Sequence, residues 1–346
     1  MTDNTWPTVD TELIDDVTLY SAKLIIPVTG PVIIDGAVAI HGDRVVHVGK
    51  RRWVLKALKQ EMTAHGTIHE RHWDGVLTPG LINAHTHLQY SGMVQVGQGT
   101  YDRFRAWELA FNEVYAEAQK TQPWKQWAED GARQMVESGT TAAADIVTDL
   151  DAAGALASQG MHGIAYWEVM GWHNAEWMEK GRTELIRQLR RMNEEQLPNL
   201  GISPHAPYTL ESEPFVDLPD IARQLNMRLH IHLAETPLEA GTYPPVLTTY
   251  SAADWSDHDW ESYRQLKEVG KGASAIQFVD QLGSLGPDVH IAHGVWANGE
   301  DRRILRQRGV GVALCPRSNR ITNTGKDAPV REYLEEGNLV SVGTDS

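Results

Sequence analysis

Short apolar runs and longer amphipathic segments follow one another along most of this chain. Between residues 18 and 50 the apolar runs are short, rich in β-branched residues and separated by Gly, Pro and Asp-Gly. This pattern predicts a small meander of strands, although the same residues could form the edge of one larger sheet. We assign residues 1–75 to an N-terminal β-subdomain, part of a composite β-sandwich. The polar, histidine-rich stretch at 65–72 predicts a solvated loop.

From residue 76 onward, strand-like runs alternate with helical patterns, such as those at 124–138 and 175–196. Eight strands in this alternation predict an α/β fold, a (β/α)8 TIM barrel, over residues 76–346. A doubly wound open sheet is the alternative, but no Gly-rich phosphate motif follows any of the runs. The predicted barrel strands are 75–85, 140–148, 161–170, 199–208, 228–235, 288–296, 310–318 and 339–346.

One segment interrupts this alternation. Residues 236–264 are rich in Pro, Ser and Asp and follow the fifth predicted barrel strand. Loops of this length in compact domains are usually active-site lids or disordered segments.

Composition narrows the class of protein. The net charge of −15 argues against binding to a nucleic-acid backbone. No apolar run is long enough to cross a bilayer, and the acidic, polar start resembles neither a secretory signal nor a basic transit peptide. The single cysteine, Cys315, suits a reducing compartment. We therefore expect a cytoplasmic protein that binds neither nucleic acid nor membrane.

Histidines and carboxylates recur where the predicted barrel strands end, and the active groups of TIM barrels lie at that edge. One buried histidine is commonly a hydrogen-bonded core residue, but burying so many ionisable groups together is costly without a cation. Imidazole and carboxylate are ligands of Zn²⁺ and also suit Fe²⁺. The pattern predicts a metal site among His85, His87, His205, His230, His232, Glu235, His290, His293 and Asp345.

Position along each strand separates the histidines that occur in pairs. His232 lies nearer the carboxyl end of its strand than His230, and His293 lies nearer that end than His290. We expect His232 and His293 to reach the barrel mouth, and their partners to pack deeper between the strands.

Five motifs, "TPGLINAHTHL", "HIHLAET", "HIAHGVW", "CPRSN" and "GTDS", resemble in order and approximate spacing the amidohydrolase superfamily. The resemblance is to its cytosine-deaminase-like branch, which includes aminohydrolases and triazine hydrolases. It implies one divalent metal ion per chain, Zn²⁺ first and Fe²⁺ as the alternative. The implied ligands are His85, His87, His232 and Asp345.

The same resemblance implies roles in catalysis. Glu235 would be the proton shuttle, and His293 would polarise the attacking water and the attacked carbon. Asp345 would accept a second proton while remaining a ligand. No lysine stands at the end of the fourth barrel strand, which argues against the carbamate-bridged, two-metal branches of the superfamily.

Substrate contacts are predicted from two further stretches. His205, in "PHAPY", resembles a substrate contact of deaminases that act on adenine nucleosides. In the segment after the first barrel strand, Trp107 and Glu108 could stack a ring and bind ribose hydroxyls, and Arg103 or Arg105 could pair with a carboxylate. In the alternative interpretation this segment is an ordinary amphipathic helix whose aromatic residues are core: Phe104, Trp107 and Phe111.

The resemblance implies a hydrolytic deaminase that converts a ring C–NH2 to C=O and releases ammonia. The motifs are similar to those of 6-aminodeoxyfutalosine deaminases and of deaminases acting on S-adenosylhomocysteine or methylthioadenosine, and they do not separate these. A second interpretation is displacement of chloride or cleavage of an amide, as in triazine hydrolases. A third interpretation is a non-catalytic or truncated amidohydrolase-like scaffold. The presence of a residue at every ligand position argues against it. We expect a small heterocyclic substrate and a homo-oligomer, a dimer.

The resemblance also bears on the end of the chain. Members of the family normally continue past the last ligand, here Asp345, with a final barrel helix and a return to the N-terminal β-subdomain. We therefore expect either that the C-terminal end is truncated, which leaves the eighth strand without its covering helix, or that this protein completes its barrel differently.

Overall fold

The computed structural model describes residues 13–194, 197, 199–241, 269–270 and 272–345. The chain divides into two compact units, residues 1–80 and 81–346. The division thus lies a few residues after the boundary predicted at residue 75. None of the helices in the described ranges is long and apolar enough to cross a membrane. Of the long segment predicted at 236–264, residues 242–264 lie outside the described residues.

In the described part of the N-terminal unit, residues 13–80, four strands form a sheet in the order β3-β2-β1-β4, accompanied by helix α1. Strand β1 pairs antiparallel with β2 and parallel with β4, and buried Val17, Leu19 and Leu58 lie in its core. The meander predicted for residues 18–50 is thus a sheet distinct from that of the barrel. The bounds are β1 Ile14–Ile25, β2 Ile33–His41, β3 Arg44–Lys50, α1 Arg51–Glu61 and β4 Met62–Leu77.

The prediction of a solvated loop at residues 65–72 was wrong, because these residues lie within β4. Their side chains are mostly exposed, which gives the stretch its polar sequence. β4 is an edge strand, and its pairing with β1 satisfies the backbone groups along one side while the polar side chains face solvent.

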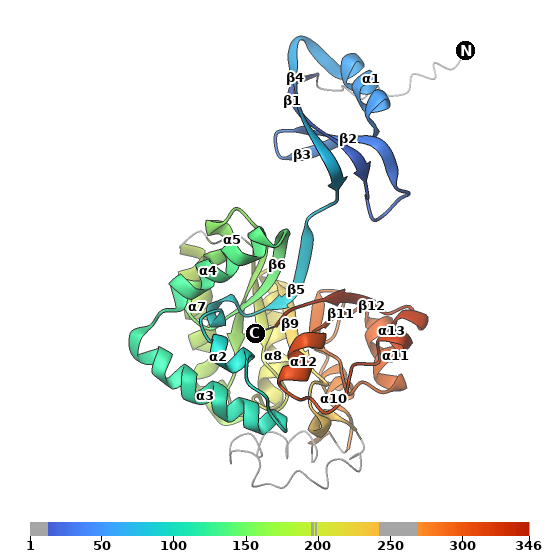
Figure 1. The fold of residues 1–346 in the computed structure, drawn as a ribbon. Coiled ribbons are helices and arrows are strands. Elements are labelled where there is room, and N and C mark those ends of the chain that lie inside the picture. Colours follow the sequence, from blue (N-terminus) through green and yellow to red (C-terminus); the bar gives the residue numbers. More distant parts are fainter. Residues whose placement is uncertain (1–12, 195–196, 198, 242–268, 271, 346) are drawn as a thin grey trace, which may run out of the picture. The chain divides into compact units, whose positions relative to one another are not determined.

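The second unit contains eight parallel strands in the order β12-β11-β10-β9-β8-β7-β6-β5 (Figure 1). The sheet closes between its first and last strands, where Thr86 bridges to Asp345 and the Asp345 backbone N–H donates to the carbonyl oxygen of His85 at 2.9 Å. The predicted (β/α)8 barrel is confirmed. Its strands are β5 Leu81–Thr86, β6 Thr140–Val147, β7 His162–Val169, β8 Leu200–Pro204, β9 Arg228–Leu233, β10 Val289–His293, β11 Gly311–Leu314 and β12 Leu339–Val342.

Helices connect these strands and cover them on the outside (Figure 1). The helix predicted at 124–138 is α4 Trp124–Glu137, and the one predicted at 175–196 corresponds to α6 Asn174–Glu176, η3 Trp177–Gly181 and α7 Arg182–Glu194. The others are η1 Leu88–Tyr90, α2 Val94–Gly97, α3 Phe104–Thr121, η2 Leu150–Ala152, α5 Ala155–Ser158, α8 Ser212–Gln224, η4 Pro237–Glu239, α10 Ala275–Gln281, α11 Gly299–Arg308, α12 Pro316–Ile321 and α13 Val330–Glu335.

The main core of the barrel unit lies between strands and helices. Ile202 of β8 and Ile231 of β9, both with no exposed area, belong to one buried cluster with Phe215 of α8 and Phe278 of α10. This packing fixes the strands, and therefore the side chains at their carboxyl ends, against a rigid outer layer.

Candidate active site

One cavity opens at the carboxyl ends of the barrel strands, and it collects most of the predicted site residues. His230 and His290 are not among its lining residues. His230 Nε2 lies 2.8 Å from His85 Nδ1, and His290 Nε2 lies 3.1 Å from Ser341 Oγ. Both therefore pack between the strands, as their position along the chain predicted. The lining residues from the predicted set are His87, Trp107, Glu108, His205, His232, Glu235, His293 and Asp345.

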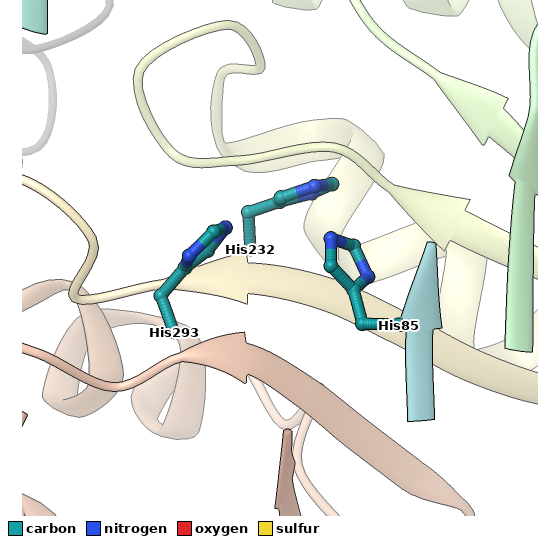
Figure 2. A group of neighbouring side chains, drawn as sticks. All are labelled: His85, His232 and His293. Atoms are coloured by element: carbon teal, nitrogen blue, oxygen red, sulfur yellow. The ribbon is translucent and has the colours of Figure 1, made fainter. Parts of the chain in front are cut away.

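Three groups of side chains in the described part of the chain could hold a metal ion, and two of them overlap at His85. The first contains His85, His87 and Asp345, and the second contains His85, His232 and His293. In each group the ligand atoms lie within 4.8 Å of one another. Figure 2 shows the three imidazoles of the second group converging from β5, β9 and β10. The predicted ligand set takes members from both groups, which share His85.

Hydrogen bonds hold two of these imidazoles in orientation. His232 Nδ1–H donates to the carbonyl oxygen of His205 at 3.1 Å, which leaves the Nε2 lone pair of His232 free. His85 is held through Nδ1 by its contact with His230, and its buried Nε2 atom faces the carboxylate of Asp345 without an aligned hydrogen bond. Histidine ligands commonly have the nitrogen that does not bind the metal fixed in this way.

The protonation states of the histidines suit a cation. Burial lowers the pKa of His87 to about 3 and places the pKa of His85 and of His232 below the ordinary value. These rings are therefore neutral at neutral pH and can offer lone pairs. The neutral imidazoles of His85, His87 and His232 and the carboxylate of Asp345 are a donor set that fits a divalent metal ion.

Asp345 is held at the closure of the barrel. Its Oδ1 atom lies 3.2 Å from His85 Nε2 and 3.4 Å from His87 Nε2, and Ser318 Oγ donates to Oδ2. Its backbone has a φ of 63°, in the left-handed region that non-glycine residues rarely adopt. Ala234 (φ 55°) and His293 (φ 73°) share this feature. Such backbone strain clusters at functional sites.

Glu235 and His293 face each other beside the two ligand groups. Glu235 Oε1 lies 3.5 Å from His293 Nε2, and the hydroxyl of Tyr208 donates to Glu235 Oε2 at 2.8 Å. Burial raises the pKa of Glu235. Burial acts to lower the pKa of His293, but the carboxylates of Glu235 and Asp345 outweigh it and raise that pKa. An acid and a base with mutually adjusted pKa values can pass a proton between water and substrate.

Glu239 fixes the backbone that carries Glu235. Its carboxylate accepts from the backbone N–H groups of Ala234, Glu235 and Thr236 at 2.8, 2.9 and 2.9 Å. Burial raises the pKa of Glu239 to about 7. These three bonds hold the strained turn after β9, so Glu235 is presented from a rigid segment.

Some of the predicted substrate contacts line the cavity, and one does not. Trp107, Glu108 and His205 line the cavity, and Glu108 Oε2 accepts from Arg105 Nη1 at 2.6 Å. Arg103 is not among the lining residues; it precedes α3, with 42% of its side chain exposed. Its pairing with a substrate carboxylate therefore stays a prediction.

The aromatic residues of α3 divide between the two interpretations. Phe104 is 4% exposed and belongs to the main core, while it also borders the cavity. Trp107 and Phe111 are half-buried and line the cavity. The core interpretation thus holds for Phe104 and in part for Trp107, which packs against the main core as well as lining the cavity. Phe111 lines the cavity.

Sequence reasoning missed several residues of the site. Asn319 and Ser318 follow β11 in the "CPRSN" motif and contact His293 and Asp345. Glu168, near the end of β7, lines the cavity and was not among the candidates. Glu168 could have been found from the sequence, because it is an acidic residue near the carboxyl end of a largely apolar strand. The candidates on the other strands were recognised by the same kind of position.

A comparison with protein families matches the Amidohydrolase family over residues 76–243 and 246–346, which cover all but two residues of the barrel unit. The chain belongs to the amidohydrolase family. The resemblance seen in the five sequence motifs is thereby confirmed.

Curated relatives of this amidohydrolase are named as deaminases. It is 29% identical over 333 residues to a 5-methylthioadenosine/S-adenosylhomocysteine deaminase of Moorella thermoacetica, covering 93% of this chain. It is 30% identical over 276 residues to a 5'-deoxyadenosine deaminase of Methanopyrus kandleri, covering 78% of this chain. The chain spans 68% of the length of the first protein and 57% of the second.

Solved structures share the fold. An aminofutalosine deaminase of Helicobacter pylori, in complex with methylthio-coformycin, aligns with a TM-score of 0.72 and 18% identity over 95% of this chain and 76% of its own. A triazine hydrolase of Arthrobacter aurescens aligns with a TM-score of 0.74 and 18% identity over 95% of this chain and 72% of its own. At these identities the likeness concerns the fold alone.

Proposed function

We propose that this amidohydrolase is a metal-dependent hydrolytic deaminase that converts a ring C–NH2 of an adenine nucleoside or related heterocycle to C=O and releases ammonia. The observation that carries the proposal is the pairing of Glu235 with His293 beside the metal-ligand groups, in one buried cavity. An acid–base pair next to a cation site is the arrangement that hydrolysis of an amidine requires.

The metal would be held by His85, His87, His232 and Asp345, with Zn²⁺ favoured and Fe²⁺ as the alternative. The chemistry of the donors supports this assignment, since neutral imidazoles and a carboxylate suit both ions. When bound, a divalent cation makes water nucleophilic at neutral pH.

Side chains of this protein would carry out the proton transfers and stabilise the developing charge. Glu235 takes a proton from the attacking water and delivers it to the leaving nitrogen. His293 stabilises the negative charge that develops on the oxygen at the attacked carbon. Asp345 would accept the second proton of that water as the C=O forms and pass it on, so that the ring nitrogen beside the new C=O carries a proton in the product and the carboxylate is restored. Tyr208 and Glu239 hold Glu235 in place during these transfers.

The substrate class rests on the relatives and on the lining of the cavity. The matching relatives are named for adenine nucleosides, and the cavity offers Trp107 for stacking and His205 and Glu108 for polar contacts. The likeness to triazine hydrolases concerns the fold alone, so the dechlorinating or amide-cleaving alternative has less support. An aminofutalosine remains within the proposed class. Cytoplasmic location and a dimeric state stay predictions.

The test is an ammonia-release assay on the metal-loaded protein with adenosine, 5'-deoxyadenosine, 5'-methylthioadenosine, S-adenosylhomocysteine and 6-aminodeoxyfutalosine. Guanine, pterins and chlorinated triazines serve as comparison compounds. We expect ammonia from at least one of the first group and no chloride from the triazines. Absence of ammonia from every compound would refute the proposal, and chloride or amine release would support the triazine-hydrolase alternative.

A further inference from the structure

Glu168 is a buried acid that the proposed mechanism does not use. It lies on β7 two residues after Tyr166, so both side chains leave the strand on the same face. The ring of Tyr166 lies 5.2 Å from that of His230 in the barrel interior. Glu168 lies two residues nearer the carboxyl end of β7 than Tyr166 and lines the cavity, with only 3% of its side chain exposed.

The carboxyl of Glu168 lacks the partners that a buried acid normally has. Its Oε1 atom is buried without a hydrogen-bond partner in the described part of the chain, and the nearest histidine nitrogen, Nε2 of His205, is 4.0 Å away. Burial raises the pKa of Glu168 to about 8. A buried polar atom without a partner costs free energy, and native proteins keep few of them outside functional sites. A ligand in the cavity would supply the missing partner.

The order of the strands places this carboxyl apart from the proton-transfer pair. β7 is separated from β10, which carries His293, by β8 and β9, and Glu235 follows β9. A heterocycle whose amino-bearing carbon faces Glu235 and His293 presents another edge toward β7. An oxygen of Glu168 also lies within 4.8 Å of ligand atoms of His205 and His232. It is therefore near enough to the reaction centre to reach the ring rather than a distant substituent.

We propose that Glu168 hydrogen-bonds the heterocycle of the bound substrate at the edge remote from Glu235, and thereby determines which rings the site accepts. The inference rests on the proposed function and deepens it. Glu168 is a contact of the ring, shared by all substrates with that ring, and it leaves selection of the sugar and 5'-substituent to other residues.

Metal binding is a second role for the Glu168 carboxyl, and experiment can distinguish it from a substrate contact. Glu168, His205 and His232 form a third group whose ligand atoms lie within 4.8 Å, so Glu168 could in principle bind a metal ion. We favour the substrate contact because His232 already belongs to the group of His85 and His293, whose imidazoles converge on one another (Figure 2). Metal content separates the two roles.

The experiment compares Glu168→Leu and Glu168→Gln in the full chain, with Glu179→Gln, an exposed acid of η3, as the matched control. Metal content and kcat/KM are measured with adenosine, 5'-deoxyadenosine and 5'-methylthioadenosine. Loss of a buried hydrogen bond should lower kcat/KM of Glu168→Leu by about ten- to a hundredfold. The loss should be the same for all three nucleosides, with metal content unchanged. Glu168→Gln should lose less, because its amide still offers a donor and an acceptor.

Three results would overturn the inference: wild-type kcat/KM in Glu168→Leu, loss of metal from that variant, or a loss that differs among nucleosides sharing the same ring. The failure of the proposed function has another signature. In that case the wild-type protein, loaded with metal, deaminates none of the nucleosides, and the inference falls with it.

Discussion

The Nδ1–H of His293 donates to Oδ1 of Asn319 at 2.9 Å, and this bond turns Nε2 of the same ring toward Glu235. Because an amide oxygen can only accept, Nδ1 of His293 carries a proton in this bond, and the second proton that the ring can take goes to Nε2, beside Glu235. Asn319 is thus a positioning residue: it acts on the reaction through the imidazole.

Replacing Asn319 by Leu should lower kcat by about ten- to a hundredfold with little change in KM, since the ring loses its fixed orientation. Asn319→Asp keeps an acceptor at this position and should retain more activity than Asn319→Leu. Steady-state kinetics on both variants checks this. Equal losses in the two variants, or a change confined to KM, would show that Asn319 does not act through His293.

Glu235→Gln should keep its metal and its fold but lose turnover, because the amide cannot carry the proton from water to the leaving nitrogen. General acid–base groups typically contribute about a hundred- to ten-thousandfold, so a loss in that range is expected. Tyr208→Phe removes only the hydroxyl that donates to Glu235 Oε2 and should lose less. Full activity in Glu235→Gln would remove Glu235 from the mechanism.

His232→Ala should lose both metal and activity, because it deletes a ligand from the group around His85. His162→Ala is the matched control, since His162 is exposed at the start of β7. Metal analysis after reconstitution should give about one equivalent for the control and much less for His232→Ala. A full equivalent in His232→Ala would contradict the assigned ligand set.

The buried carboxyl of Asp145 should make the stability of the folded protein depend on pH. Burial raises its pKa from 3.8 to about 8, while its Oδ1 accepts from the backbone N–H of Leu88 at 2.9 Å. Since the folded protein holds this proton more tightly than the unfolded chain, the stability it contributes is present below pH 3.8 and is lost as pH rises through about 8.

In Asp145→Asn this contribution disappears. Thermal unfolding of the metal-free protein at pH 5 and pH 8 should therefore show a smaller difference for the variant than for the wild-type chain. An unchanged difference would mean that Asp145 has the same pKa in the folded and unfolded states.

The sequence was sufficient for the parts of this structure that depend on repetition along the chain. Alternating strands and helices predicted the barrel, and the position of His232 relative to His230 predicted which imidazole reaches the cavity. Those inferences use only the period of a strand and the known edge at which barrels place their active groups.

Other contacts depend on residues brought together by the closed barrel and could not be predicted. The bond between Asn319 and His293 joins two successive strand ends, and its geometry depends on the left-handed backbone at His293. The exposed strand β4 was missed because its stability comes from pairing with β1 rather than from its own apolar residues.

The most direct test of the account is a titration of metal into the metal-free protein, with bound metal and the rate of ammonia release from a nucleoside substrate followed together. The account predicts that the rate rises in proportion to bound Zn²⁺ and levels off at about one equivalent per chain, and that His232→Ala shows neither binding nor activity. Undiminished activity in the metal-free protein, or one bound equivalent with no ammonia from any adenine nucleoside, would contradict it.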